Sequence, residues 1–168
     1  MKDFAPLLSD YAFFETHATE AASDAAAYAE LIAPRVAATG TIRLLDFGCG
    51  TGSFTERLLK LVRIPPERLK LALTEPVSAS HQRAAERLAA FSTSTIEHGD
   101  SLAAIAEREF ELIISNHVLY YVPDLAGTLA ALVERLAPDG HLLLAIAGND
   151  NPGSARVDPA RAVMARRC

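Results

Sequence analysis

The chain has 168 residues, of which half are apolar, and this composition suits one domain with a sizeable core better than two domains. Its formal charge of −5 would repel a long phosphate backbone, and no basic cluster precedes Arg156, so nucleic acid is not expected as a partner. The two cysteines are too few for a disulfide framework or a metal site. The sequence shows neither a leader pattern nor an apolar run of about 18 residues, so we expect a cytoplasmic protein without a membrane span.

Hydrophobic periodicity predicts helices and strands that alternate along the chain. In order, we expect helix Thr19–Val36, strand Ile42–Phe47, helix Phe54–Val62, strand Leu69–Thr74, helix Val77–Phe91, strand Thr93–His98, a short helix Leu102–Glu107, strand Leu112–Ser115, helix Asp124–Leu136 with Asp124 as its cap, and strand His141–Ala147. Pro34 should kink or end the first helix, and Pro138-Asp139-Gly140 should turn the chain into the last strand. The alternation predicts a doubly wound, Rossmann-like α/β fold with a mostly parallel sheet of five recognisable strands.

Three segments are expected. Residues 1–41 should form an N-terminal helical lid, residues 42–147 the α/β core, and residues 148–168 a tail with at most a short basic helix, because the periodic pattern fails from Gly148 onward.

The stretch LLDFGCGTG, Leu44 to Gly52, has the strongest functional signal in the sequence. Glycines at alternating positions after a strand allow positive φ angles, close approach of a ligand, and room for the next helix. A tight turn without a ligand is the alternative interpretation. The spacing is not that of a dinucleotide fingerprint or a P-loop, and Asp46 would repel a pyrophosphate but attract a cation.

A second acid, Glu75, ends the second strand, where its carboxylate can accept hydrogen bonds from ribose hydroxyls. A ligand with a ribose, a cationic part and no phosphate fits both acids. S-adenosylmethionine, with its ammonium and sulfonium groups, is such a ligand.

The series LLDFGCGTG, LALTEP, HGDS, FELIISNHVLYYV and LAPDGHLLLA resembles, in order and spacing over residues 42–147, the class I S-adenosylmethionine-dependent methyltransferases. The resemblance implies that the backbone at Gly48 and Gly50 faces the methionine part and ribose, that Asp46 lies near the ammonium and that Glu75 binds the ribose. It also implies roles for Asp100 and Ser101 at the adenine and for Asn116 beneath the sulfonium, with Ser80 as a fainter candidate. The alternatives are that Asp100 caps a helix, that Asn116 ends its strand and that Glu75 begins a helix.

A shorter likeness, carried by YAFFETHATEA, by EP after the second strand and by LYYVPDLAGTLAAL, is to the histamine N-methyltransferase family of small-amine methyltransferases. This likeness implies a small-molecule acceptor, with Glu20 near its amine, His117 as a polar pocket residue and Tyr120 and Tyr121 as aromatic wall. His17 is a further substrate-side candidate. The alternatives are packing for the tyrosines and a solvated surface position for His17.

The expected reaction is in-line methyl transfer, in which an amine acceptor must be neutral and His117 or Glu20 could take its proton. The alternative function is a binding module that holds the cofactor without catalysis or needs a partner, and a nicotinamide oxidoreductase is a more distant one. Members of the superfamily normally add two further strands, which are absent from the pattern here. We therefore expect that a second molecule covers the edge of the strand His141–Ala147, or that a C-terminal part has been lost.

Overall fold

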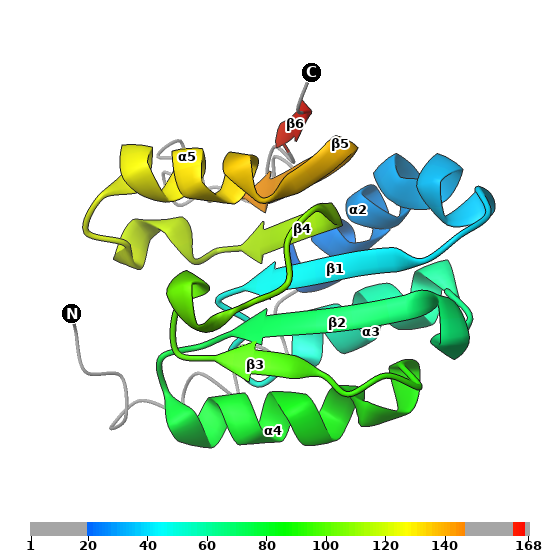
Figure 1. Ribbon diagram of the computed structural model, residues 1–168, viewed down its shortest axis with the longest axis horizontal. Coiled ribbons are helices and arrows are strands. Elements are labelled where there is room, and N and C mark those ends of the chain that lie inside the picture. The colour runs from blue at the N-terminus through cyan, green and yellow to red at the C-terminus, as the bar shows by residue number, and fades with distance from the viewer. Residues whose placement is uncertain (1–19, 147–162, 167–168) are drawn as a thin grey trace.

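The computed structural model describes residues 20–146 and 163–166, with the side chains of residues 21–146 (Figure 1). Its elements are α2 (Glu20–Ala37), β1 (Ile42–Phe47), α3 (Ser53–Val62), η2 (Pro66–Arg68), β2 (Leu69–Thr74), α4 (Ser78–Leu88), η3 (Ala89–Phe91), β3 (Glu97–Gly99), η4 (Leu102–Ala104), β4 (Phe110–Asn116), η5 (Leu119–Tyr121), α5 (Leu125–Glu134), β5 (Leu136–Ala145) and β6 (Val163–Arg166). The strand order is β3-β2-β1-β4-β5-β6, with β1 to β5 parallel and β6 antiparallel to β5. The expected doubly wound fold with five parallel strands is confirmed.

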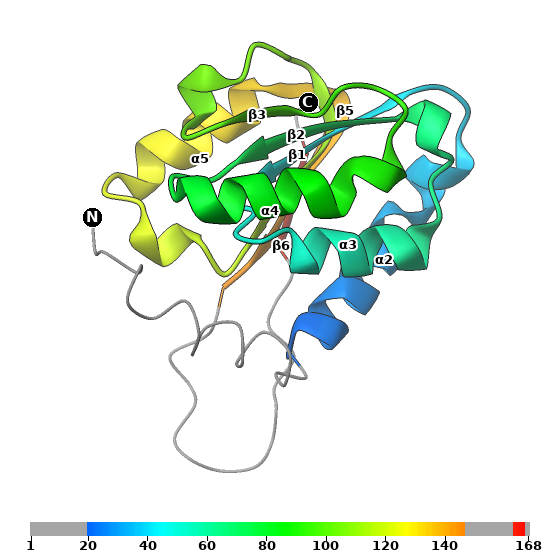
Figure 2. The ribbon, with the colours of Figure 1, turned by 90° about the horizontal axis from the view of Figure 1, so that it is seen from below.

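Helices cover both faces of the sheet (Figure 2). The helices α2, α3 and α4 pack on one face, in a buried cluster that includes Tyr28, Leu44 and Leu88. The helix α5 packs on the other face, in a cluster that includes Leu45 and Leu132. Leu44 and Leu45 belong to different clusters because successive side chains of a strand point to opposite faces.

The first described helix, α2, agrees with the range expected for it and includes Pro34 near its end. The end of α2 is held by the turn before β2, since the guanidinium of Arg68 donates hydrogen bonds to the carbonyl of Val36 in the helix at 3.2 Å and to that of Gly40 just after it at 2.8 Å. The rings of Tyr28 and Phe54 meet edge to face with their centroids 5.4 Å apart, which joins α2 to α3. The helix is therefore fixed over the same face of the sheet as α3.

The region around β3 differs from the expectation. β3 is shorter than the range Thr93–His98, because the residues before it make loop contacts: Thr93 donates its N–H to the carbonyl of Pro66 at 3.1 Å. The helix expected over Leu102–Glu107 is a single 3₁₀ turn. It stops there because the carboxylate of Glu97 binds the N–H groups of the residues that would continue it, including that of Glu107 at 3.1 Å.

The strand β5 begins earlier than expected. Its pairing with β4 shifts between the pairs Phe110–Leu136 and Leu112–His141, so the predicted turn is a bulge within the strand. Gly140 is required in this bulge, since a Cβ there would lie 2.6 Å from the carbonyl oxygen of Phe110. The helix before it, α5, begins as predicted, with the side chain of Asp124 accepting the N–H of Gly127 at 2.9 Å.

The C-terminal tail contains a strand that the sequence did not predict. β6 pairs with β5 from His141 to Leu144, so the expectation of at most a short basic helix is wrong. The edge of β5 is covered by this chain itself, and the reason for expecting a second molecule there is removed.

Candidate functional site

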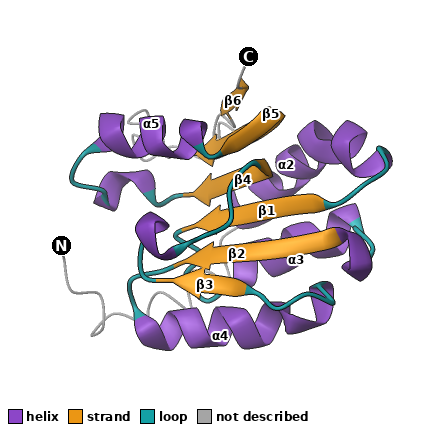
Figure 3. Ribbon diagram, viewed as in Figure 1, coloured by secondary structure: helices purple, strands orange, loops and turns teal. Residues whose placement is uncertain are grey.

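The carboxyl ends of the parallel strands lie along one edge of the sheet, marked by the arrowheads in Figure 3. In register, Phe47 pairs with Thr74, Thr74 with Gly99, and Asn116 with Ala145. The strand order reverses between β1 and β4, and the crevice outside such a point is where doubly wound sheets bind ligands. Most of the cofactor residues proposed from the sequence lie at or next to these ends: Asp46, Gly48, Gly50, Glu75, Asp100, Ser101 and Asn116.

The glycine loop after β1 has positive φ angles of 79° at Gly48, 53° at Gly50 and 76° at Gly52. A Cβ at Gly48 would lie 2.4 Å from Cγ1 of Val118, and one at Gly52 would lie 3.1 Å from Cα of Ala84. At these two positions, other residues of the protein already occupy the space that a side chain would need. The ligand indicated by the sequence is therefore not the only reason for the glycines.

Glu75 holds the glycine loop against the end of β2. Its Oε2 accepts the N–H of Gly50 and its Oε1 accepts the N–H of Val77, both at 3.0 Å. The N–H of Glu75 donates to the carbonyl of Gly99 at 3.0 Å, which fixes the residue beside β3. Since each carboxylate oxygen has two lone pairs, both can accept a further hydrogen bond, such as one from a hydroxyl group.

Asp46 is the buried acid of the site, with its side chain next to α3. The hydroxyl of Thr55 donates a hydrogen bond to its Oδ2. Burial raises the pKa of Asp46 to about 7; the hydrogen bond from Thr55 lowers it and the charge of Glu75 raises it. One hydrogen bond compensates only part of the cost of burying this carboxylate, so a cation brought next to Asp46 would stabilise its ionised form.

Asp100 and Ser101 are exposed after β3, and the hydroxyl of Ser101 donates to Oδ1 of Asp100 at 2.9 Å. The N-cap residue of η4 is Ser101 and makes no capping bond with its side chain, so the alternative that Asp100 caps a helix gains no support. Ser80, the fainter candidate, is buried in the first turn of α4.

Two histidines next to this region were not predicted as part of the site. The rings of His81 on α4 and His98 on β3 meet edge to face with centroids 4.4 Å apart. Burial lowers the pKa of His81, nearby His98 lowers it further, and the charges of Glu75 and Asp100 raise it. No periodicity connects the two histidines, because they come together only through the packing of α4 on β3.

The end of β4 presents Asn116 and His117. The side-chain Oδ1 of Asn116 is buried and has no hydrogen-bond partner among the described residues. His117 follows with a positive φ of 57° and donates its N–H to the carbonyl of Ala145 at 2.9 Å. A left-handed conformation at a residue other than glycine costs about 1–2 kcal/mol, and such residues cluster at functional sites.

The imidazole of His117 bonds at both nitrogens. Its Nε2 lies 2.9 Å from Oδ2 of Asp24 on α2, and its Nδ1 lies 2.7 Å from the hydroxyl of Tyr120. Asp24 is buried, whereas Tyr120 and its neighbour Tyr121 are 47% and 49% exposed, so neither tyrosine is a core residue. The three side chains form a line from the interior to the surface.

The acid next to His117 is Asp24, which was not among the residues proposed from the sequence. Glu20 and Asp24 are one turn apart on α2, and Asp24 is again one turn before Tyr28, which is buried. This spacing was the available signal for Asp24. His17 and the side chain of Glu20 lie outside the described residues.

Tyr28 adds a buried hydroxyl group close enough to Asp24 and Asp46 to feel the charges of both. Its hydroxyl has no hydrogen-bond partner among the described residues. Burial raises its pKa above the ordinary value, and the charges of Asp24 and Asp46 raise it further, so the phenol stays protonated and can donate.

These groups fit S-adenosylmethionine by their hydrogen-bonding character. The carboxylates of Asp46 and Glu75 and the unpaired Oδ1 of Asn116 are acceptors, which suit an ammonium group and ribose hydroxyls. The unpaired hydroxyl of Tyr28 is a donor suited to a carboxylate. Acidic groups at this position do not suit a pyrophosphate, which argues against a nicotinamide dinucleotide.

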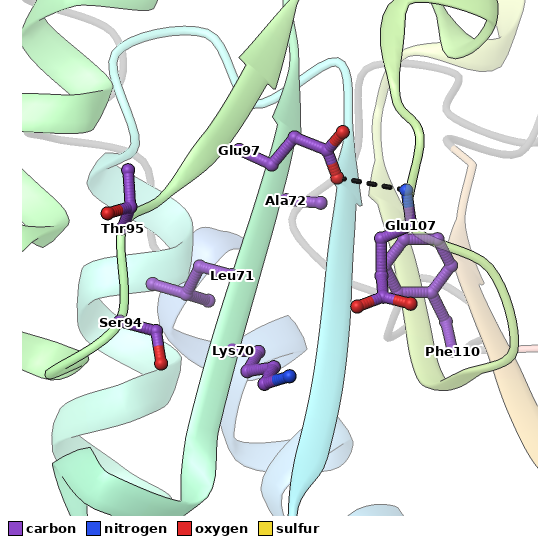
Figure 4. Close-up of a pocket in the computed structure, with 8 residues that line it drawn as sticks. All are labelled: Lys70, Leu71, Ala72, Ser94, Thr95, Glu97, Glu107 and Phe110. Carbon is purple, nitrogen blue, oxygen red and sulfur yellow. Dashed lines mark hydrogen bonds between the residues drawn. The ribbon is translucent and has the colours of Figure 1, made fainter.

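A small pocket lies away from this edge (Figure 4). Its volume is about 280 Å³, and it is lined by Lys70, Leu71, Ala72, Ser94, Thr95, Glu97, Glu107 and Phe110. Lys70 to Ala72 come from the first half of β2, and Phe110 begins β4, so the pocket lies toward the amino ends of the strands. It is separate from the candidate site.

Within residues 20–146 and 163–166, no group of three or more His, Cys, Asp or Glu residues is placed to hold a metal ion. No helix of the same residues has the length and apolar character needed to cross a membrane.

Comparison with known proteins places this chain in a family. The chain is similar to trans-aconitate 2-methyltransferase of Methylobacterium radiotolerans, with 34% identity over 90% of this chain and 51% of that protein. It is also similar to malonyl-[acyl-carrier protein] O-methyltransferase of Acetivibrio thermocellus, with 33% identity over 63% of this chain and 36% of that protein. The chain thus spans about half or less of the length of these relatives.

A solved structure shows the same fold. The N-methyltransferase NodS from Bradyrhizobium japonicum, in complex with S-adenosyl-L-homocysteine, superposes with a TM-score of 0.51 and 25% identity over 68% of this chain and 58% of that one. The family described as a methyltransferase domain matches residues 14–162, which include every described element of the site. The chain therefore belongs to the methyltransferase-domain family.

Proposed function

We propose that this chain binds S-adenosylmethionine at the carboxyl ends of β1, β2 and β4 and transfers its methyl group to a small molecule, with an amine as the acceptor. The observation that carries the proposal is the acceptor-rich cradle at this edge: buried Asp46, Glu75 bonded to Gly50, and the unpaired Oδ1 of Asn116. Such a cradle recognises a cationic nucleoside.

Each part of the cradle has a proposed role. The backbone at Gly48 and Gly50 would face the methionine part and ribose, Asp46 would pair with the ammonium, and Glu75 would accept the ribose hydroxyls. The hydroxyl of Tyr28 would donate to the carboxylate of the methionine part.

The remaining positions complete the proposal. Asp100 and Ser101 would bind the adenine amino group, and Asn116 would lie beneath the sulfonium. Ser80, the fainter candidate from the sequence, is given no role in this set.

The sulfonium of the bound cofactor supplies an activated methyl group. The protein mainly has to align the acceptor with that group, and alignment alone can lower a barrier by about 7–11 kcal/mol. The half-exposed rings of Tyr120 and Tyr121 lie 5.7 Å apart, edge to face, and their faces suit an amine. We propose His17 and Glu20 as further residues on the acceptor side of the site.

Calorimetric titration with S-adenosylhomocysteine tests the cofactor site. Glu75→Gln should weaken binding by about 10- to 100-fold, because the amide has one accepting oxygen where the carboxylate has two, and hydrogen bonds to a charged group are worth about 1.5–3 kcal/mol. The matched control is Glu67→Gln, an exposed glutamate in η2 at the other end of β2, which should bind like the parent chain.

Three outcomes separate the candidate functions. Binding of S-adenosylhomocysteine together with methyl release to an amine supports the proposal. Binding without methyl release to any of a panel of amines and phenols favours the binding module. Saturable binding of NAD with no response to S-adenosylhomocysteine would overturn the cofactor assignment.

A further inference from the structure

The line Asp24–His117–Tyr120 has a defined hydrogen-bond direction. A carboxylate only accepts hydrogen bonds, so Nε2 of a neutral His117 must carry the proton that it shares with Asp24 at 2.9 Å. A neutral imidazole has one donor and one acceptor, and Nδ1 is then the acceptor. The hydroxyl of Tyr120, 2.7 Å away, therefore donates to Nδ1.

The line also has a defined location. His117 directly follows Asn116 at the end of β4, beside the point where the strand order reverses. Asp24 is buried on α2, and the side chain of His117 is 23% exposed, so exposure increases along the line towards Tyr120. Both ring nitrogens of His117 are engaged, and Tyr120 is the member that reaches the surface.

We propose that Asp24, His117 and Tyr120 form a proton relay that removes a proton from the methyl acceptor; this inference rests on the proposed function. As the acceptor atom forms its bond to the methyl carbon, the sulfur–carbon bond breaks and its electron pair stays on sulfur. The proton of the acceptor passes to the oxygen of Tyr120 while the phenolic proton passes to Nδ1 of His117. The resulting imidazolium faces the carboxylate of Asp24, and atoms and charge balance.

The relay defines the class of acceptor. A carboxylate is already ionised at neutral pH and needs no proton acceptor, whereas an ammonium group must lose a proton before its nitrogen can attack and a phenol must lose its O–H proton. Asp24 does not touch the acceptor and is a positioning residue, since it holds His117 in the Nε2–H tautomer. The acceptor should therefore be a nitrogen or oxygen that bears a proton.

Turnover of three probes tests the acceptor class. Histamine, catechol and benzoate offer an amine, a phenol and a carboxylate to the 168-residue chain with S-adenosylmethionine. Asp24→Asn and Tyr120→Phe should each lower kcat with histamine or catechol by about 10²- to 10⁴-fold, the usual contribution of general acid–base catalysis. Asp139→Asn, which removes an exposed carboxylate in the β5 bulge, is the matched control and should leave kcat unchanged. Turnover of benzoate alone would overturn the proposal.

A measurement independent of turnover tests the relay itself. Long-range ¹H–¹⁵N correlation spectra of the imidazoles, with His117→Asn to assign the signals, should show a low-field, slowly exchanging Nε2–H proton at His117. This signal should disappear in Asp24→Asn, and Tyr120→Phe should shift the Nδ1 resonance. A loss of kcat in the same two variants then distinguishes a proton relay from hydrogen bonds that are only structural. A protonated Nδ1 in the parent chain contradicts the relay. Calorimetry with S-adenosylhomocysteine reports on the cofactor site separately, so the two proposals can fail independently.

Discussion

Replacement of buried Asp46 by asparagine should change how the stability of the protein depends on pH. The pKa of Asp46 is raised by burial from 3.8 to about 7. Between these two values the folded chain holds a proton that the unfolded chain has released. The free energy of unfolding therefore falls as pH rises through this window, and the loss is complete above pH 7.

The size of the effect follows from the shift. Each pKa unit corresponds to about 1.4 kcal/mol, so about two units between pH 5 and pH 7 cost the parent chain about 3 kcal/mol. The asparagine of the variant cannot ionise, so the variant escapes this loss. The free energy of unfolding of Asp46→Asn minus that of the parent chain should therefore rise by about 3 kcal/mol from about pH 5 to about pH 8.

Urea unfolding of both chains at about pH 5, 6, 7 and 8 measures this difference. Other titrating groups contribute equally to both chains and cancel when the two free energies of unfolding are subtracted. Asp139→Asn, which replaces an exposed carboxylate in the β5 bulge, should follow the parent chain. If the parent chain and Asp46→Asn keep the same difference within about 1 kcal/mol across the series, Asp46 is not a buried acid of raised pKa, and the reasoning fails.

The same acid should couple cofactor binding to pH. An ammonium group pairs with ionised Asp46, so binding of S-adenosylhomocysteine should strengthen by about tenfold per unit as pH rises towards about 7 and should release a proton. Calorimetry in buffers of different ionisation enthalpy counts that proton. The release should be absent in Asp46→Asn.

Two further substitutions test the cradle. Tyr28→Phe removes a buried hydroxyl that has no partner among the described residues. The free energy of unfolding of the free chain, measured in urea, should therefore stay the same or rise by up to about 1 kcal/mol, while binding of S-adenosylhomocysteine weakens by about tenfold or more. Unchanged binding would remove Tyr28 from the cofactor site. Gly48→Ala should destabilise the chain by about 2–3 kcal/mol, because its Cβ meets Val118 at 2.4 Å and its φ is positive. Adding Val118→Ala should restore part of the loss, and a double variant no more stable than Gly48→Ala would show that the clash is not the cause.

Much of the fold was predictable because its signals are local. The apolar residues of β1, the glycines after it and the helix cap at Asp124 each depend on a few neighbouring residues. The bulge in β5 was taken for a turn, since Gly140 is required by its contact with the carbonyl of Phe110 on β4. β6 was missed because a short strand is stabilised by the edge it pairs with.

The positions of most residues proposed for the cofactor could also be predicted from the sequence. In a parallel sheet, residues that follow successive strands come to one edge, so the positions of Asp46, Glu75 and Asn116 in the chain predicted their position in space. What the sequence could not show is that Glu75 already binds the N–H of Gly50, or that Val118 fills the space next to Gly48.

The sequence by itself determined the fold class and the edge of the sheet at which Asp46, Glu75 and Asn116 lie, because the alternation of strands and helices and the hydrophobic period are properties of neighbours along the chain. Only the tertiary structure decided that Asp24 lies 2.9 Å from His117. These residues are 93 positions apart, and the packing of α2 against the sheet brings them together. A contact of that kind depends on the angle and register of a packed helix, which no local pattern records.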